Sequence, residues 1–172
     1  MARHKLPIPP RFEQILERYE REIMRYLLHV LGNSQDAADL FQETWLRAYR
    51  AYPRLAFGSS VRPWLYAIAS NLCRNRARDS ARRRRVLISD PEELSDANAR
   101  RRHQRFHHNG EGYAMVRMRE LISDLPRKQQ QALHLRYFAG LNYDAIALAL
   151  GCSEESARAN VSQAMRKLRA SW

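Results

Sequence analysis

The sequence predicts an all-α protein that consists of two small helical domains joined by a basic linker. Apolar residues recur at three- and four-residue spacing over most of the chain, which is the period of helices with one buried face. These helical stretches form two groups, and a charge-dense run without that period separates them between Val86 and Gly112. The expected bounds are 1–85 for the first domain, 86–112 for a flexible basic linker and 113–172 for the second domain.

Charge and composition narrow the class of partner. The 172 residues carry a formal net charge of +12, which favours a polyanionic partner, nucleic acid first and an anionic membrane surface second. A hydrophobic fraction of 45% supports packed cores and excludes a disordered basic tail. No apolar run approaches a membrane span, and the N-terminus has no apolar signal core. Cys73 and Cys152 form no CxxC pair, which argues against a disulfide framework or cysteine-rich zinc site and fits a reducing cytoplasm.

Two helices are predicted before residue 53. The first, Arg11 to Leu31, ends at Gly32, where a left-handed residue commonly closes a helix. The second, Gln35 to Tyr52, can be capped by Asn33 or Ser34. Its buried face is expected to hold Ala38, Phe41, Trp45, Ala48 and Tyr52, and its exposed face Asp36, Asp39, Glu43, Arg47 and Arg50. Judged by itself, the acidic first half is explained by the helix dipole and by solubility.

The stretch from Pro63 to Arg85 predicts a helix with two different faces. A loop, Leu55 to Ser60, precedes it and exposes Phe57. One face is apolar and consists of Trp64, Leu65, Ile68, Ala69 and Leu72. The other is amide and guanidinium, formed by Asn71, Arg74, Asn75, Arg78 and Arg82. Arginines bind phosphates and asparagines can read base edges, so the helix is either a nucleic-acid reader or a solvated Arg-rich surface.

A basic run is expected to leave this helix and enter the linker. The run consists of Arg82, Arg83, Arg84 and Arg85, and a second one follows at Arg100–Arg102. We interpret the linker as a segment that tracks something anionic. The imidazoles of His103, His107 and His108 could touch a metal, but no thiolate or carboxylate pattern lies beside them, so a solvated linker is favoured and no metal site is predicted.

The C-terminal third predicts a second helical unit that contains a helix-turn-helix. A helix through Leu125 is closed by Pro126, and the next helix runs to Phe138 and buries Tyr137 and Phe138 in part. Asn142 caps a short helix whose inward residues are Ile146, Leu148 and Leu150. Gly151, Cys152 and Ser153 form a tight turn, in which Gly151 suits the end of that helix and Ser153 suits the cap of the next. The last helix, Glu154 to Ala170, is expected to bury Ala157, Val161, Ala164 and Leu168.

The start of that last helix is expected to enter a major groove. Its exposed residues there are Ser156, Arg158, Ala159, Asn160 and Gln163, and Arg166 follows among basic turns. Arg suits guanine, while Asn or Gln suits adenine. Helix pairs with a glycine turn also occur in ordinary bundles, and the basic C-terminal turns favour DNA.

Two motif blocks resemble the bacterial sigma factors. DAADLFQETWLRAY (Asp36 to Tyr49) and WLYAIASN (Trp64 to Asn71) are similar to conserved region two. LPRKQQQALHLRYF (Leu125 to Phe138) and LNYDAIALALG (Leu141 to Gly151) are similar to region four. The spacing leaves no room for region three, which is typical of the extracytoplasmic-function group.

The resemblance implies roles for the residues above. It implies that the acidic second helix docks on the clamp of core RNA polymerase, that the loop holding Phe57 captures a flipped base, and that the linker runs toward the polymerase channels. The flap and an anti-sigma factor are further expected partners. The implied docking residues are Asp39, Gln42, Glu43 and Arg47. The implied contacts to the single-stranded −10 element are Phe57, Trp64, Asn71, Arg74, Asn75 and Arg78. The implied contacts to the −35 duplex are Ser156, Arg158, Ala159, Asn160, Gln163 and Arg166.

Some positions depart from the family pattern, and two other classes of protein compete with it. Val61 stands where the family often has Phe, and Asn160 and Gln163 stand where basic residues are usual, so we infer no promoter sequence. A stand-alone helix-turn-helix regulator would need no acidic docking helix. A nucleic-acid enzyme would need catalytic carboxylates, a phosphate-binding glycine loop or a metal-ligand set, and the sequence suggests none, so neither catalysis nor a cofactor is predicted.

Overall fold

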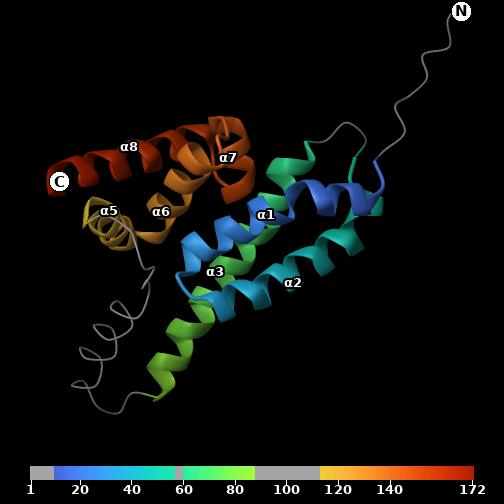
Figure 1. Cartoon of the computed structure of the whole chain (residues 1–172), viewed down its shortest axis with the longest axis horizontal. Coiled ribbons are helices and arrows are strands. Elements are labelled where there is room, and N and C mark those ends of the chain that lie inside the picture. Colours follow the sequence, from blue (N-terminus) through green and yellow to red (C-terminus); the bar gives the residue numbers. More distant parts are fainter. Residues whose placement is uncertain (1–9, 57–59, 88–112) are drawn as a thin grey trace, which may run out of the picture.

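The computed structural model describes residues 10–56, 60–87 and 113–172, and the regular elements within these ranges are helical (Figure 1). The all-α prediction is therefore confirmed. No helix among the described residues is both long and apolar enough to cross a membrane. The elements are α1 (Phe12–Leu31), α2 (Ser34–Ala51), the 3₁₀ turn η1 (Tyr52–Arg54), α3 (Val61–Leu87), α5 (Tyr113–Ser123), α6 (Arg127–Leu133), the π-helical turn η2 (His134–Phe138), α7 (Tyr143–Leu150) and α8 (Glu154–Ser171).

The helix ends follow the predicted capping chemistry. Gly32 closes α1 with a φ of 65°, a left-handed value that glycine adopts without steric cost. Asn33, rather than Ser34, caps α2, because its side-chain oxygen accepts from the amides of Gln35 at 2.8 Å and Asp36 at 3.3 Å. Ser153 caps α8 in the same way. Local sequence therefore sets where these helices begin and end.

Helices α1, α2 and α3 pack together as the N-terminal half of the molecule. The buried face of α2 differs from the predicted one: Ala37, Leu40 and Thr44 are buried beside Trp45 and Ala48, whereas Ala38, Phe41 and Tyr52 are only half-buried. Thr44 tolerates burial because its hydroxyl donates to the Leu40 carbonyl at 2.6 Å. A small polar residue thus occupies a core position that apolar periodicity overlooks.

Helices α5 to α8 form the C-terminal half, where α8 buries the predicted residues and two other predictions fail. Leu148 of α7, expected to point inward, is 58% exposed. Tyr137 and Phe138, expected to be partly buried, are largely exposed. The helix after Pro126 changes to a π-helical turn in which the Ala139 amide donates to the His134 carbonyl at 3.0 Å. That extra residue per turn shifts the helical phase, so the side chains that follow leave the expected buried face.

The two halves pack against each other, with their most extensive contact between α3 and α7. The larger apolar cluster takes residues from both halves, including Leu65 and Ala69 of α3 and Ile146 and Leu150 of α7. A smaller cluster lies among α5, α6 and α8, around Leu133, Ala164 and Leu168 and their neighbours. Figure 1 shows the C-terminal helices gathered beside α1 and α3. Segments that are distant in sequence therefore share one core.

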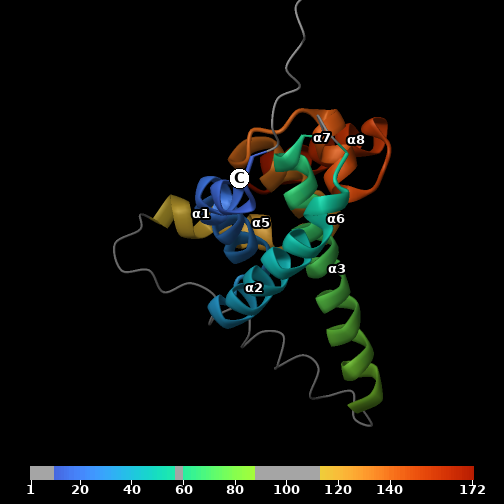
Figure 2. The same ribbon diagram turned by 90° about the vertical axis from the view of Figure 1, so that its right-hand side faces the viewer.

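The C-terminal part of α3 projects beyond the other helices, as Figures 1 and 2 show from two directions. The helix continues to Leu87, so the basic run Arg82–Arg85 extends the helix instead of leaving it as predicted. Arginine is a strong helix former, and no glycine or proline follows Pro63 within this helix, which explains the extension. The remaining linker residues, with His103, His107 and His108, lie outside the described residues.

Candidate nucleic-acid interface

The polar face of α3 is presented only in part. Asn71, Asn75 and Arg78 are exposed, as a DNA-contacting stripe requires, whereas Arg74 is half-buried. Trp64 is also half-buried and its ring lies 6.4 Å from that of Tyr52. Phe57, the predicted base-capturing aromatic, lies outside the described residues. The structure therefore brings the amide and guanidinium groups onto one helix face, with one of them turned toward a neighbour.

Arg74 connects α3 to the C-terminal half. Its guanidinium donates to the backbone carbonyl of Leu150, the last residue of α7, and to the side-chain oxygen of Asn71. The last carbonyls of a helix have no partner within the helix and carry the negative end of its dipole. A cationic donor is well suited to that position. Arg74 thus serves as a C-terminal cap for a helix of the other half.

Arg62 makes an equivalent contact near the start of α3. Its guanidinium donates to the carbonyl of Ala139, directly after η2, and its Nε donates to Glu22 of α1 at 2.7 Å. Burial lowers the pKa of Arg62, but the Glu22 carboxylate more than compensates, so its pKa is raised. Tyr66 donates to the same carboxylate at 2.7 Å. Charged hydrogen bonds therefore hold the N-terminal part of α3 to α1 and to the C-terminal half.

The inner face of α3 and the side of α1 that faces it hold groups that do not ionise near neutral pH. Burial raises the pKa of Tyr26 and of Tyr66, and Tyr26 shares a buried 2.7 Å hydrogen bond with Ser70. Burial also raises the pKa of the Cys73 thiol to about 12, even though Arg127 acts in the opposite direction. Cys73 is therefore a core residue and not a reactive thiolate.

Helix α8 presents the predicted major-groove residues outward. Ser156, Arg158, Ala159, Gln163 and Arg166 are exposed, while Asn160 is half-buried. The Arg158 guanidinium pairs with Glu154 at 2.8 Å and lies over the Tyr143 ring at 4.3 Å. That aromatic face holds the guanidinium near the first turn of α8. The arrangement suits a recognition helix whose N-terminal residues meet base edges.

Two amides on α8 already have partners. Asn160 donates to the Ser156 carbonyl at 2.8 Å, and Gln163 accepts from Gln129 of α6 at 2.8 Å. The Asn160 side-chain oxygen and the Gln163 side-chain nitrogen make no hydrogen bond to another described residue and can bind DNA. These contacts limit the ways in which each amide can bind an adenine edge.

The acidic face of α2 is exposed only in part, because Asp39 is exposed whereas Asp36 and Glu43, both predicted to be exposed, are half-buried. An apolar surface lies beside these acids. Glu43 pairs with Arg47 at 2.5 Å, and Asp39 lies 4.0 Å from Arg76 of α3, which also bonds Asp36. Gln42 is exposed on the same helix. Sequence reasoning missed Leu46 and Tyr49, which are 44% and 61% exposed within the same motif block. Large exposed apolar residues beside charges are typical of a protein-binding surface. The sequence signal for them was that both residues fall outside the apolar stripe of α2.

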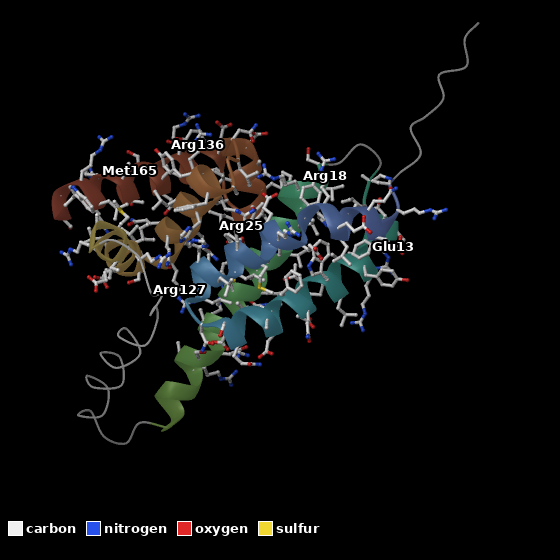
Figure 3. The ribbon with its side chains drawn as sticks, viewed as in Figure 1. Glu13, Arg18, Arg25, Arg127, Arg136 and Met165 are labelled. Carbon is white, nitrogen blue, oxygen red and sulfur yellow. The ribbon has the colours of Figure 1, made fainter. Side chains whose placement is uncertain are left out.

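An apolar groove on the C-terminal half was also missed. It has a volume of about 480 Å³ and lies among α5, α6, η2 and α8. Met165, labelled in Figure 3, contributes to it together with Met118, Ile122, Leu133, Tyr137, Phe138, Leu168, Arg169 and Trp172. Flexible methionines and exposed aromatics favour the apolar face of a partner helix. Within the described ranges no group of three or more metal-ligating side chains occurs.

Comparison with known proteins identifies both halves. The family model for sigma-70 region 2 matches residues 15–83, and the model for sigma-70 region 4 matches residues 115–168. The ECF RNA polymerase sigma factor SigC of Mycobacterium tuberculosis is 33% identical over 153 residues, which cover 88% of this chain and 78% of the relative. SigM of Bacillus subtilis is 27% identical over 165 residues, covering 92% and 93% respectively.

Solved structures share the fold at lower identity. The sigma factor RpoE of Bartonella quintana, in complex with the anti-sigma factor NepR, matches with a TM-score of 0.67 and 20% identity. The match covers 93% of this chain and 95% of that chain. CnrH, in complex with the cytosolic domain of CnrY, matches with a TM-score of 0.65 and 19% identity, covering 92% and 85%. At these identities the likeness concerns the fold.

Proposed function

Because the chain belongs to the sigma-70 family, as an RNA polymerase sigma factor of the extracytoplasmic-function type, we propose that its two halves divide promoter recognition between them. Sigma factors of this type direct core polymerase to promoters and assist promoter opening. We assign residues 1–85 to polymerase docking and −10 recognition, 86–112 to a connecting basic linker and 113–172 to −35 recognition. A stand-alone helix-turn-helix regulator is not favoured, because the family match includes region 2 as well as region 4.

The −10 contacts are assigned to α3 and the loop before it. Asn71 and Asn75 would bind the separated strand through their amides, while Arg74 and Arg78 would bind its phosphates. Phe57 and Trp64 would hold unstacked bases, since aromatic faces stack on bases of any type. Polymerase must help to separate the strands, because unstacking a base costs a few kcal/mol.

The −35 contacts are assigned to the exposed face of α8. Arg158 lies in the first turn, where recognition helices meet base edges, and Gln163 and Arg166 follow on the same exposed side. Ser156, Ala159 and Asn160 complete the surface. Asn160 is half-buried and donates to the Ser156 carbonyl of the same helix, which supports a role in holding the local structure of α8 in addition to any base contact.

Polymerase docking is assigned to α2, and the surface of this helix is the main observation that supports the proposed division of roles. Asp39, Gln42, Glu43 and Arg47 lie on an exposed helix beside the basic α3, so a charge-complementary site for the polymerase clamp adjoins a DNA-binding site. A regulator that only binds duplex DNA needs no such pair of surfaces. The apolar groove around Met165 is assigned to the flap, whose segment would insert an apolar helix face.

Further partners and the place of action follow from the same assignment. The anti-sigma factor bound to the Bartonella sigma factor supports an anti-sigma partner for this chain as well. Because the protein would act while bound to core polymerase, we expect it in the cytoplasm. It would act by binding, with neither a catalytic step nor a cofactor of its own.

Run-off transcription tests the proposal. Core polymerase and a library of genomic promoter fragments are incubated with and without the purified chain, and specific transcripts should appear only with it. Asp39→Arg or Glu43→Arg should abolish co-purification with core while circular dichroism stays normal, because Asp39 is exposed and the Arg47 partner of the half-buried Glu43 is exposed, so no buried ion is left unpaired. Glu17→Arg, an exposed reversal on α1, is the matched control and should bind core normally. Normal co-purification of both α2 variants would refute the docking surface.

A further inference from the structure

A cavity of about 320 Å³ lies where the two halves meet. Helices α1 and α3 supply its walls from the N-terminal half, and η2 with Ala139 closes it from the C-terminal half. Phe138 also lines the apolar groove assigned to the flap, and none of the other proposed contacts to DNA or polymerase lines this cavity. Its volume lies in the range that holds small organic molecules.

The cavity contains a buried imidazole whose polar atoms have no partner. His134 is 3% exposed, and neither of its ring nitrogens has a hydrogen-bond partner among the described residues. Burial, together with nearby His29, lowers the pKa of His134 to about 4, so the ring is neutral at pH 7. A neutral imidazole offers one donor and one acceptor, and leaving both unpaired costs free energy. An occupant of the cavity would remove that cost.

The walls of the cavity suit a flat apolar group. The rings of His29 and Phe138 lie 5.3 Å apart, and those of His134 and Phe138 lie 5.0 Å apart. Tyr26 and Tyr66 line the opposite elements and their rings meet edge to face at 5.1 Å. Aromatic groups prefer such stacked and edge-on surroundings.

The charge of the cavity favours an anion. Glu22 lines the cavity, but its carboxylate is compensated by Arg62 and by the Tyr66 hydroxyl. Arg25 also lines it, and its Nε donates to the Arg21 carbonyl of the same helix over a long distance of 3.4 Å. No carboxylate within the described ranges forms an ion pair with Arg25, so the lining has one uncompensated positive charge. Figure 3 labels Arg25 on α1 and Arg18 nearer the N-terminal end of the same helix.

We propose that this cavity binds a small organic anion with a flat apolar body, of the aromatic carboxylate class, and that binding favours the packed arrangement of the two halves. The carboxylate would accept from Arg25 and from His134, and the flat body would lie against Phe138. Both halves line the cavity, so the ligand binds the packed form in preference to a separated one. The inference goes beyond promoter recognition and does not depend on it.

Binding should be coupled to proton uptake by His134. Besides His134, the charged and titratable groups that face the cavity are Glu22, Arg25, Tyr26 and His29 from α1 and Arg62 and Tyr66 from α3. A bound carboxylate adds a negative charge beside the imidazole, which favours its protonated form. Affinity should therefore rise as the pH falls from about 7.5 to about 5.5.

Isothermal titration of the full chain with benzoate and with benzamide tests the proposal, because the two probes share shape and differ in charge. Benzoate should bind saturably with a Kd of about 1 mM or tighter, and benzamide should bind about tenfold more weakly or worse. Proton uptake is measured by repeating the titration in buffers of different ionisation enthalpy. Hydrogen exchange at η2 should slow when benzoate binds.

Matched variants locate the site. Arg25→Gln, an exposed change, should weaken benzoate binding about tenfold or more, whereas Arg18→Gln should leave it unchanged. His134→Phe keeps an aromatic ring and should abolish the pH dependence. Equal weakening by both arginine variants would show general attraction to a basic protein and would overturn the proposal. Absence of saturable benzoate binding, or equal binding of benzamide, would overturn it as well.

Discussion

Helices α3 and α8 carry the two proposed DNA surfaces, and the fold presents them differently. On α8 the side chains of Arg158, Gln163 and Arg166 face outward, and the partners of Arg158 and Gln163 among the described residues come from α8 itself, α6 and α7. On α3 the guanidinium of Arg74 caps α7 of the other half. One surface is therefore available in the packed molecule, whereas the other contributes a residue to the packing.

The difference teaches that one residue type serves two purposes in this chain. A guanidinium binds a helix C-terminus for the same reason that it binds phosphate, since both offer oxygen acceptors with negative charge. Terminal nitrogens of Arg74 that bond Leu150 and Asn71 must change partners before they bind a DNA strand. The four predictions below test this contrast, from the largest expected effect to the smallest.

Ile146→Ala should destabilise the packing of α7 against α3, in which Arg74 of α3 takes part. Ile146 of α7 is fully buried in the cluster that both halves share, so truncation leaves a cavity and lowers the free energy of unfolding by about 2–5 kcal/mol. Urea denaturation followed by circular dichroism measures it. Leu148→Ala on the same helix is the control and should change stability by less than about 0.5 kcal/mol, because Leu148 is exposed. Equal losses would contradict the observed face of α7.

Lowering the pH should weaken the same region through His134. Its pKa is lowered from 6.5 to about 4 in the folded chain, chiefly by burial and then by His29. The unfolded chain therefore takes up a proton that the folded chain does not. The resulting stability is fully present above about pH 6.5 and is lost as the pH falls toward 4.

The expected loss between about pH 7.5 and 5 is about 2 kcal/mol. Urea denaturation at both pH values measures it, and His134→Phe should remove this component from the pH profile. A profile for His134→Phe that matches the parent chain would exclude His134 as the titrating group.

Asn71→Ala and Arg158→Ala should separate the two DNA surfaces. Each loses a base or strand contact worth roughly 1–3 kcal/mol, or about ten- to a hundredfold in affinity. Permanganate footprinting of open complexes is carried out on duplex promoter, on a pre-melted bubble and on a template without the −35 duplex. The bubble should rescue Asn71→Ala only in part, because the strand contact is still missing.

The template without the −35 duplex should erase the defect of Arg158→Ala, because protein and template then lack the same contact. If Arg158→Ala stays equally defective on that template, α8 is not the −35 reader. If the bubble restores Asn71→Ala completely, Asn71 aids melting without binding the strand.

Arg62→Met should weaken the contact between the two halves, and the expected loss in the free energy of unfolding is the smallest of the four effects. Arg62 bridges Glu22 and the Ala139 carbonyl, and its partial exposure limits the loss to about 1 kcal/mol. Small-angle scattering should show a larger radius of gyration. Arg76→Met is the matched control, because Arg76 pairs with Asp36 and Asp39 inside the N-terminal half. An equal expansion in both variants would show that Arg62 has no special role in joining the halves.

Local chemistry made part of this protein predictable from its residues. The left-handed glycines Gly32 and Gly151 and the caps Asn142 and Ser153 were predicted, because each acts within a few residues of itself. The buried face of α8 was predicted as well, since one apolar stripe on that helix leaves a single way to pack. The two motif blocks predicted the family for the same reason, being contiguous in sequence.

Only the tertiary structure decided how the surfaces are used. Periodicity shows that a helix has an apolar face, but the neighbours decide how far around the helix burial extends, as Thr44 and Leu148 demonstrate. No local signal predicts that Arg74 meets Leu150 or that His134 closes a cavity against α1, because those partners are distant in sequence. The sequence by itself determined the helices and their family, and long-range packing determined which polar groups stay free to bind a partner.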